Sequence, residues 1–219
     1  MFSAAASVRL VKESEKRGKN RAKRITVVLN QALLYKSNVG SAMRSTAGQK
    51  ASQSLMKTLF LLRHAKSSWD FPELKDFERP LSDRGNRDIP VMGERLRERA
   101  HAVDCIISSP AVRANTTARK MAEAIGYPVE EVSSNPELYF AGTGMFLKAA
   151  SLMDDGCHSL MLVGHNPAIT EFANAMTGEN IENIPTCGLV QMSLPIDQWS
   201  AIELGCASLV DFDYPKKQH

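Results

Sequence analysis

Four side chains in this sequence have the chemistry needed to bind and transfer a phosphate group. Arg63 and His64 directly follow an apolar run. Arg113 follows a second apolar run, and His165 ends a third. Arginine presents a planar fork of N–H donors that matches two phosphate oxygens at once. A neutral imidazole is a nucleophile at physiological pH, because its ordinary pKa is about 6.5 and nearby arginines lower it further. These residue types predict a site that binds a phosphate group.

Three short apolar runs must position these side chains. Residues 58–62, 103–109 and 159–165 are each continuously apolar or nearly so, which is typical of parallel strands buried on both faces. In an open α/β sheet, ligands bind outside the carboxyl ends of the strands, where helix N-termini direct free N–H groups. If the three strands are parallel neighbours, the two arginines and two histidines converge on that edge.

Helix signals follow the second and third runs. The predicted N-caps are Ser109 and Asn166, the first helical residues Pro110 and Pro167, and the helix ends Gly126 and Gly178. Arg113 then lies in the first turn of its helix, where a cation opposes the helix dipole unless an anion is bound. This favours a binding role for Arg113 over a place on the helix surface.

The remaining elements are less directly tied to the site. Residues 80–100 predict a helix that starts near Ser82 and is interrupted by Pro90 and Gly93. Towards the C-terminus, residues 188–194 and 199–204 predict a hairpin, and residues 207–212 predict a last strand.

Charge divides the chain into two parts. Residues 1–55 carry 11 Lys and Arg against 2 Glu, a net charge of +9, whereas the remainder carries 16 basic and 22 acidic residues, a net charge of −6. We therefore expect a basic N-terminal extension over residues 1–55 and one globular domain over residues 56–219.

The extension has the composition of an organelle transit peptide, since it is rich in basic and hydroxyl residues and contains no aspartate. This predicts a mitochondrial or plastid location, and a cytoplasmic one if the segment does not target the protein. A disordered tail, an upstream extension of a chain that starts at Met56, and a nucleic-acid arm are the alternatives. Nucleic acid is not favoured as a partner, because no aromatic residues are interleaved with the charge.

Composition also excludes several classes of protein. No run approaches the roughly 18 apolar residues of a membrane helix, so no membrane partner is expected. The four cysteines form no C-x-x-C pair and no zinc-type cluster with histidine. We expect no metal and no cofactor.

Taken together, three segments resemble the histidine phosphatase superfamily, specifically its small SixA-like phosphohistidine phosphatase group. They are RHAKS from Arg63, SSPAVRANTTA around Arg113, and VGHNP around His165. The resemblance covers residues 56–212. It implies an α/β fold like that of the cofactor-dependent phosphoglycerate mutases, a three-layer α/β/α sandwich with a mostly parallel central sheet. It also implies that His64 forms a phosphohistidine, while Arg63, Arg113 and His165 hold the phosphoryl oxygens.

Three further residues are open at this stage. Glu137, in NPELYFAG, matches the position where related enzymes carry an acidic proton donor, but it also fits a solvated loop residue. Ser67 bonds either to the loop backbone or to phosphate. The usual R-H-G of the family is R-H-A here, with Ala65, and Asp70 stands where the family often has asparagine, so its role is left open.

The leading hypothesis is a metal-independent phosphatase that acts through phosphohistidine. The chain after residue 55 is too short to build much of a cap, and an open site suits a phosphorylated protein side chain, including phosphohistidine, or a small phosphate ester. A phosphoglycerate mutase-type phosphotransferase is the alternative within enzymes. A non-catalytic phosphate-binding adaptor on the same fold is the alternative outside them.

Overall fold

The structure of the protein is a computed structural model that describes residues 56–99 and 102–218. The predicted N-terminal extension, residues 1–55, lies outside the described residues. None of the helices in the described ranges is both long and apolar enough to cross a membrane.

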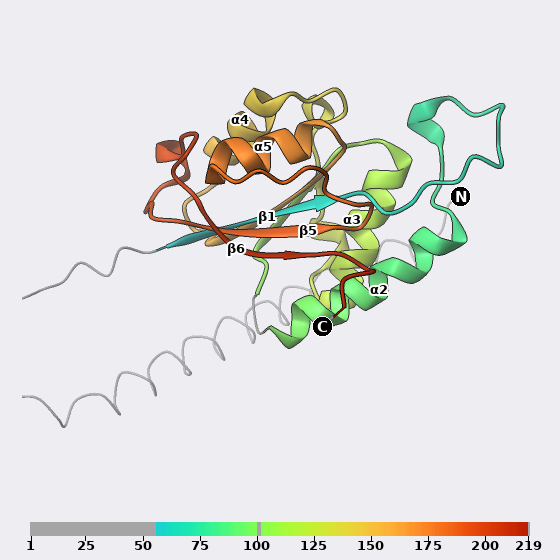
Figure 1. The fold of residues 1–219 in the computed structure, drawn as a ribbon, viewed down its shortest axis with the longest axis horizontal. Helices are drawn as coiled ribbons and strands as arrows, with labels where there is room; N and C mark the ends of the chain where they lie inside the picture. The colour runs from blue at the N-terminus through green and yellow to red at the C-terminus, as the bar shows by residue number, and fades with distance from the viewer. Residues whose placement is uncertain (1–55, 100–101, 219) are drawn as a thin grey trace, which may run out of the picture. The chain divides into compact units, whose positions relative to one another are not determined.

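A six-stranded sheet forms the centre of the fold (Figure 1). Its strands are β1 (Lys57–Arg63), β2 (Cys105–Ser108), β3 (Ser133–Ser134), β4 (Ser159–Gly164), β5 (Leu189–Leu194) and β6 (Ser208–Asp213). Their order across the sheet is β3-β2-β4-β1-β5-β6. The pairs from β3 to β1 are parallel, and β5 is antiparallel to both of its neighbours, so only β5 runs against the rest. The predicted mostly parallel sheet is confirmed.

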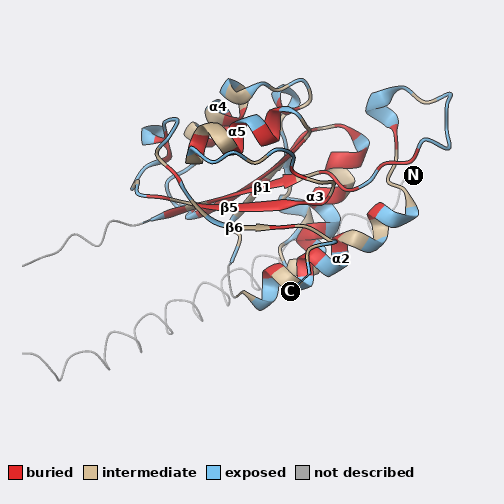
Figure 2. Cartoon of the chain, viewed as in Figure 1, coloured by how far each residue is buried: buried red, intermediate tan, exposed pale blue. Residues whose placement is uncertain are grey.

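Helices cover both faces of this sheet, which gives the predicted three layers. Helices α2 (Asp83–Glu98) and α3 (Val112–Ile125) lie on one face, and α4 (Thr143–Ser151) and α5 (Ala168–Thr177) lie on the other (Figure 1). Side chains of β1 alternate between the two cores: Leu59 and Leu61 pack on the α4–α5 side, and Phe60 and Leu62 on the α2–α3 side. All four are fully buried, and the middle of β1 is red in Figure 2. Burial on both faces explains why the run is continuously apolar.

The helices that follow β2 and β4 begin later than the sequence predicts. Helix α3 begins at Val112 and α5 at Ala168, so Pro110 and Pro167 lie before them. Ala111 and Pro167 occupy the N-cap positions, so the predicted caps Ser109 and Asn166 are wrong. The predicted helix ends are confirmed: Gly126 and Gly178 adopt left-handed φ values of 77° and 73°, which glycine accommodates without strain.

Helix α2 runs without interruption through Pro90 and Gly93, so the predicted break is wrong. Its apolar face is fully buried against α3 and the sheet, and this packing outweighs the lost hydrogen bond at proline. A Cβ atom at Gly93 would collide with the Cβ of Ala124, so glycine allows α2 and α3 to approach closely. Ser82 is the N-cap, as predicted, and accepts a hydrogen bond from the Gly85 N–H at 3.2 Å.

Gly85 joins α2 to the loop that follows β1. The Lys66 carbonyl oxygen accepts hydrogen bonds from the Ser82 N–H at 2.9 Å and from the Ser82 hydroxyl at 3.0 Å. This contact brings Lys66 directly over the first turn of α2, where a Cβ atom at Gly85 would overlap the same carbonyl oxygen. Glycine is therefore required at this crossing.

The C-terminal hairpin differs from the prediction. Residues Trp199–Ala201 form a 3₁₀ helix, and β6 is the strand that pairs with β5. Trp199 is fully buried, and its indole N–H donates to the Cys157 carbonyl oxygen at 2.7 Å. The 3₁₀ helix thus buries the large indole with its N–H satisfied.

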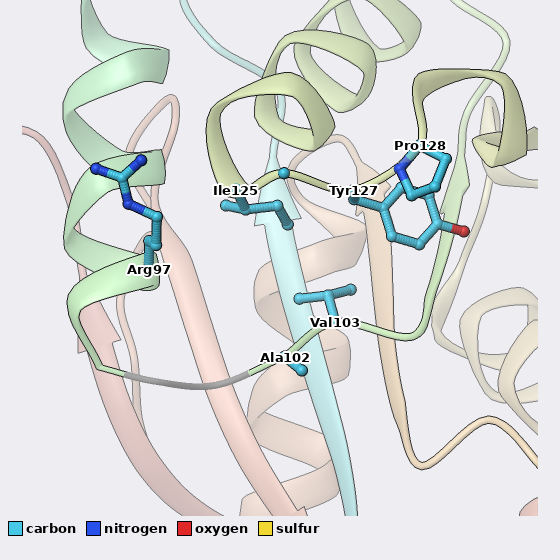
Figure 3. Close-up of a pocket in the computed structure, with 7 residues that line it drawn as sticks. Arg97, Ala102, Val103, Ile125, Tyr127 and Pro128 are labelled. Atoms are coloured by element: carbon cyan, nitrogen blue, oxygen red, sulfur yellow. The ribbon is translucent and has the colours of Figure 1, made fainter. Parts of the chain in front are cut away.

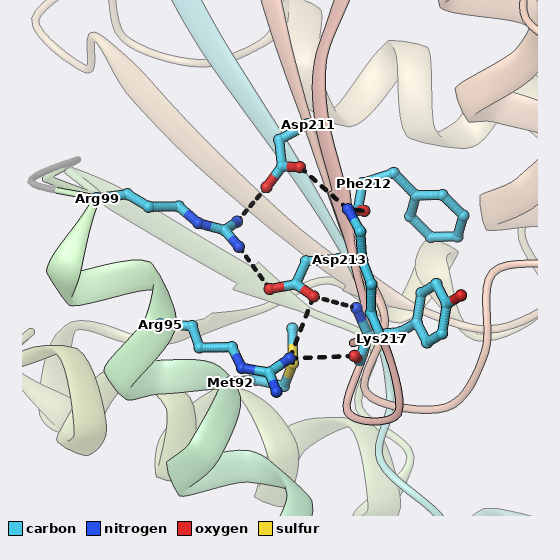
Figure 4. A network of polar contacts seen from close by, with 8 residues as sticks. Met92, Arg95, Arg99, Asp211, Phe212, Asp213 and Lys217 are labelled. Carbon is cyan, nitrogen blue, oxygen red and sulfur yellow. Dashed lines mark hydrogen bonds and ion pairs between the residues drawn. The ribbon is translucent and has the colours of Figure 1, made fainter. Parts of the chain in front are cut away.

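A network of charged residues ties β6 to the C-terminal end of α2 (Figure 4). Arg99 pairs with Asp211 and Asp213, and Arg95 lies 3.2 Å from Asp213. The Asp213 side chain is fully buried. Burial raises its pKa, but the Tyr214 N–H and the two arginines outweigh that effect and lower it overall. The network fixes the outer strand of the sheet to a helix of the adjacent layer.

Candidate active site

Pairing of β1 with β4 brings the two histidines together. Arg63 is opposite Gly164 in the register, and the His64 N–H donates to the Gly164 carbonyl oxygen at 3.0 Å. The next side chains along, His64 and His165, have ring centroids 5.0 Å apart with an interplanar angle of 53°. Both follow the carboxyl ends of parallel strands, as the apolar runs predict.

His64 is held in one tautomer. Its Nδ1 lies 2.8 Å from the Ala65 carbonyl oxygen, which can only accept, so Nδ1 carries the proton and Nε2 carries the lone pair. Burial lowers the pKa of His64 to about 3, against the opposing effect of the Ala65 hydrogen bond, and the positive charges of His165, Arg113 and Arg63 lower it further. The ring is therefore neutral at physiological pH.

His165 lies in the turn between β4 and α5. Its Nε2 is 2.8 Å from the hydroxyl oxygen of Ser109, at the end of β2. Its Nδ1 is buried and has no hydrogen-bond partner among the described residues. Burial, followed by the charge of Arg113, lowers the pKa of His165 to about 4, so this ring is also neutral at pH 7. Ser109 is thus a neighbour of the second histidine.

Arg63 is directed by the segment that precedes β5. Its NH1 group donates to the Ile184 carbonyl oxygen at 2.7 Å and to the Asn183 side-chain oxygen at 3.3 Å. Asn166 donates to the same Asn183 oxygen at 2.7 Å. The Nε–H of Arg63 is buried and has no partner in the described part of the chain. Arg63 therefore keeps a free N–H donor beside His64.

Arg113 is buried in the first turn of α3, where the sequence predicts it. Its NH1 group donates to the Asp76 backbone oxygen at 2.5 Å, and its NH2 group donates to the Asp76 carboxylate at 2.9 Å. Asp76 belongs to the 3₁₀ helix Asp76–Glu78, in the loop between β1 and α2. The same carboxylate accepts from the Tyr139 hydroxyl at 3.0 Å and from Arg79 at 3.0 Å.

The sequence did not predict a place in the site for Asp76, Arg79 or Tyr139. It also did not predict the contact of Ser109 with His165. Asp76 and Arg79 lie in a loop with no periodic pattern, and Ser109 stands before a proline, which is typical of a helix cap. A charged pair three residues apart in DFER was the one local signal for this loop. It does not identify Arg113 as the partner.

Ser67 and Glu137 have partners other than the two histidines. The Ser67 hydroxyl accepts from Arg79 at 2.6 Å, so its partner is a side chain of its own loop. The Glu137 carboxylate pairs with Lys148 at 2.9 Å, and both side chains are about half exposed. Asp70 accepts from the Ser68 hydroxyl at 2.5 Å. The structure therefore brings both arginines and both histidines to one edge of the sheet, and it pairs Ser67 and Glu137 with other side chains.

Ala65, which replaces the usual glycine, has a structural explanation. Its side chain is fully buried and belongs to the core between the sheet and the α2–α3 layer. Its N–H donates to the Thr117 hydroxyl at 3.0 Å, which connects the loop after β1 to α3. A methyl group at this position adds a core contact and leaves the backbone carbonyl that holds His64 in place.

A pocket of about 240 Å³ adjoins His165. It is lined by residues 138–141, Phe146 and residues 165–168. The Tyr139 ring stands edge-on to His165 with centroids 5.8 Å apart, and Phe140 is 88% exposed. The pocket therefore offers apolar and aromatic walls beside the histidine pair.

A separate pocket of about 290 Å³ lies at the amino end of β2, between the ends of α2 and α3 (Figure 3). Arg97, Val103 and Tyr127 are among its lining residues. None of the four converging residues contributes to it, so it is distinct from the site at the carboxyl edge.

Comparisons with known proteins agree with this arrangement. A family model for the histidine phosphatase superfamily (branch 1) matches residues 59–141, which include Arg63, His64 and Arg113. An uncharacterized protein of Mycobacterium tuberculosis (strain ATCC 25618 / H37Rv) is 32% identical over 166 residues, covering 71% of this chain and 100% of that protein. An uncharacterized chloroplastic protein of Arabidopsis thaliana is 30% identical over 156 residues, covering 68% of this chain and 71% of that protein.

A solved structure extends the likeness to the fold. The crystal structure of the putative phosphohistidine phosphatase SixA from Agrobacterium tumefaciens matches with a TM-score of 0.62 and 28% sequence identity. The match covers 73% of this chain and 98% of that one. It therefore accounts for nearly the whole of the smaller protein.

Proposed function

The chain belongs to the histidine phosphatase superfamily and to its SixA-like group, and we propose that it hydrolyses phosphorylated substrates through a covalent phosphohistidine on His64. Membership makes the protein an enzyme of the phosphatase class. The covalent step, the substrate and independence from metal ions are the parts that we propose.

One observation carries the proposal: the Ala65 carbonyl holds the Nδ1 proton of His64 and leaves the lone pair on Nε2. In the first step, Nε2 attacks phosphorus and forms a P–N bond, while the bond to the leaving group breaks and its electron pair goes to that group. In the second step, water attacks phosphorus, the P–N bond breaks and inorganic phosphate leaves. Both histidines are neutral at pH 7, so no base is needed to activate the nucleophile.

Hydrogen-bond donors of the two arginines and of the neutral His165 ring stabilise the charge that spreads over the phosphoryl oxygens in both steps. The Nε–H of Arg63, the N–H groups of Arg113 that Asp76 does not use, and Nδ1 of His165 are the available groups. Two guanidinium cations supply the positive charge that metal ions supply in other phosphoryl-transfer sites. This supports a reaction that needs no metal.

The pocket beside His165 supports a substrate whose leaving group carries a ring. Its volume of about 240 Å³ and its aromatic walls suit the imidazole of a phosphohistidine side chain or the ring of an aryl phosphate. The likeness to a putative phosphohistidine phosphatase supports the same class. Phosphorylated protein or small phosphate esters are therefore the proposed substrates.

Glu137 remains the proposed proton donor to the leaving group. Its ion pair with Lys148 is half exposed, and exposed pairs of this kind contribute only about 0–1 kcal/mol. The pair can therefore open without much cost, which leaves the carboxyl group available to a substrate.

Residues 1–55 are proposed as a targeting segment for an organelle. The excess of Lys and Arg and the absence of aspartate support this, and one relative is named chloroplastic. Import of the full chain into isolated plastids or mitochondria, with removal of the extension, tests the proposal. A chain that stays outside both would contradict it.

The deciding experiment measures phosphate release by the full chain in the presence of a chelator. The substrates are p-nitrophenyl phosphate, a phosphohistidine peptide and 3-phosphoglycerate, and the variant is His64→Ala. We expect release from the first two, and none from the variant. Loss of turnover in the presence of the chelator would contradict the proposal that the reaction needs no metal. Isomerisation of phosphoglycerate would favour a mutase, and peptide binding without release would favour an adaptor.

A further inference from the structure

Asp76 contacts three residues around the candidate site, although the sequence did not single it out. Its backbone oxygen accepts from Arg113 at 2.5 Å. Its carboxylate accepts from Arg113 at 2.9 Å, from the Tyr139 hydroxyl at 3.0 Å and from Arg79 at 3.0 Å. These partners come from α3, from the loop before α4 and from the loop of Asp76 itself. One residue thus joins three separate segments around the phosphate site.

We propose that Asp76 is a positioning residue, which holds the guanidinium of Arg113 in the orientation that binds the phosphoryl group. The inference rests on the proposed function, because it assigns Asp76 to the same site. The loop between β1 and α2 then completes the active site through this single residue.

Counting donors on Arg113 shows why the contact positions the side chain and does not block it. A guanidinium has five N–H hydrogens. Asp76 engages one on NH1 and one on NH2. The N–H hydrogens that Asp76 does not engage, including that of Nε, are the ones that can reach phosphoryl oxygens. Two fixed bonds on one guanidinium also remove its freedom to rotate, which favours binding by preorganisation.

The charge state of Asp76 indicates that it positions Arg113 and does not donate a proton to the leaving group. Burial raises the pKa of Asp76, but hydrogen bonds from Arg113 and Tyr139, together with the charge of Arg113, outweigh it and lower the pKa overall. A carboxylate that stays ionised at neutral pH has no proton to give to a leaving group. Its negative charge is matched by Arg113 and Arg79, so the site keeps its net positive charge.

Tyr139 extends the effect to the second histidine. Its hydroxyl donates to Asp76, and its ring stands edge-on to His165 and to Phe77 at centroid distances of 5.8 Å and 5.1 Å. Removal of the Asp76 carboxylate therefore releases two groups from their hydrogen bonds: the Arg113 guanidinium and Tyr139, whose ring forms one wall of the pocket beside His165. Tyr139→Phe removes one hydrogen bond from Asp76 and keeps the ring, so it measures this secondary contribution alone.

The test compares Asp76→Asn and Asp76→Ala with Asp70→Ala in the full chain. Asp70 lies on the same loop, and its carboxylate bonds to Ser68 rather than to an arginine. Calorimetry with inorganic phosphate gives Kd, and turnover of p-nitrophenyl phosphate and of an alkyl phosphate gives kcat and KM. The thermal unfolding midpoint of each variant shows whether it is folded.

We expect Asp76→Ala to weaken phosphate binding and lower kcat/KM by a factor of about 10 to 100. The loss should appear with both the aryl and the alkyl substrate. Asp76→Asn should lose less, because the amide oxygen still accepts from Arg113, and Asp70→Ala should be unchanged. In an Arg113→Ala background, Asp76→Ala should have almost no further effect on either quantity.

Two results would overturn the proposal. A loss confined to the alkyl phosphate would make Asp76 a proton donor, and equal losses with and without Arg113 would show that it does not act through that side chain. Phosphate affinity separates these failures from failure of the proposed function. If the wild type binds phosphate but hydrolyses nothing, the effect of Asp76 on Kd still decides the inference, and an unchanged Kd rejects it.

Discussion

His64 and His165 lie side by side at the carboxyl edge of the sheet, with ring centroids 5.0 Å apart, although 100 residues separate them in the sequence. The parallel pairing of β1 with β4 fixes this distance through the register of Arg63 with Gly164. The relationship does not depend on a flexible loop. It places the proposed nucleophile and the proposed phosphate ligand at the carboxyl ends of two buried strands.

Replacement of His64 by alanine should abolish turnover. Loss of the nucleophile removes the covalent route, so kcat should fall by a factor of about 10³ or more. Rapid quenching of the wild type with a phosphate-labelled substrate should trap an acid-labile phosphoenzyme, which His64→Ala should not form. His158→Ala, at an exposed histidine, is the matched control and should keep full activity. A labelled phosphoenzyme in the His64 variant would assign the nucleophile elsewhere.

The value of kcat/KM should stay constant as the pH falls through about 6.5, the usual pKa of histidine, and should decrease only at a much lower pH. Burial lowers the pKa of His64 to about 3 and that of His165 to about 4 in the free enzyme. His64 must be neutral to attack, so the rate should fall only as the pH drops towards those values. The measurement is kcat/KM from pH 4 to 8, corrected for the second ionisation of the substrate phosphate. A loss of activity centred near pH 6.5 that belongs to the enzyme would contradict this.

The same two histidines should lower stability in acid. Their folded-state pKa values lie below the unfolded value of about 6.5, so the unfolded chain binds more protons between that pH and about pH 3. The free energy of unfolding should therefore be unaffected by them above pH 6.5 and should decrease as the pH falls below it. Urea unfolding of the wild type and of His165→Gln at pH 7.5 and pH 5 measures the difference. The variant should lose less stability on acidification.

Phe140→Ala should change substrate preference without changing stability. The side chain is 88% exposed and belongs to the lining of the pocket beside His165. Loss of the ring contact should raise KM for p-nitrophenyl phosphate about threefold to tenfold, and KM for acetyl phosphate, which carries no ring, should stay the same. Leu152→Ala, at a 74% exposed position after α4, is the control. An equal rise in KM for both substrates would contradict a role of the pocket in binding the ring.

Asp213→Ala should destabilise the fold without affecting catalysis. The buried carboxylate pairs with Arg95 and Arg99, and its loss leaves two partly buried cations without that partner. Breaking a buried pair on one side costs about 3 kcal/mol in the free energy of unfolding, which urea titration measures. Glu203→Gln, at an exposed residue, should change it by less than about 0.5 kcal/mol. Values of kcat and KM below the unfolding transition should equal those of the wild type.

Much of the catalytic edge could be predicted because strand ends carry a strong local signal. The apolar runs before His64 and at His165 locate two parallel strands, and parallel strands bring their carboxyl ends to one edge. Arg113 follows from the same logic, since a cation in a first helical turn needs an anion. Asp76 could not be predicted, because its contact with Arg113 depends on how an irregular loop folds across α3. The sequence contains no periodicity in that loop.

The errors in the predicted elements have related causes. Pro90 suggests a helix break, but the buried face of α2 continues on both sides of it and outweighs the local preference. The run after Trp199 suggests a strand, but a hydrogen bond from the indole to Cys157 turns it into a 3₁₀ helix. Ser109 suggests a cap, but the register of β2 places it beside His165. In each case a tertiary contact determines the local conformation.

The conformation of the loop after His64 depends on Gly85, a residue of α2 that does not contact the substrate. The loop after His64 crosses α2 where any side chain larger than hydrogen would overlap the Lys66 carbonyl. A random library screened for activity should accordingly show intolerance at this position as severe as at a residue that handles phosphate. The helix that carries Gly85 thus sets a steric limit on the loop, and only a coupled change in both could shift that limit.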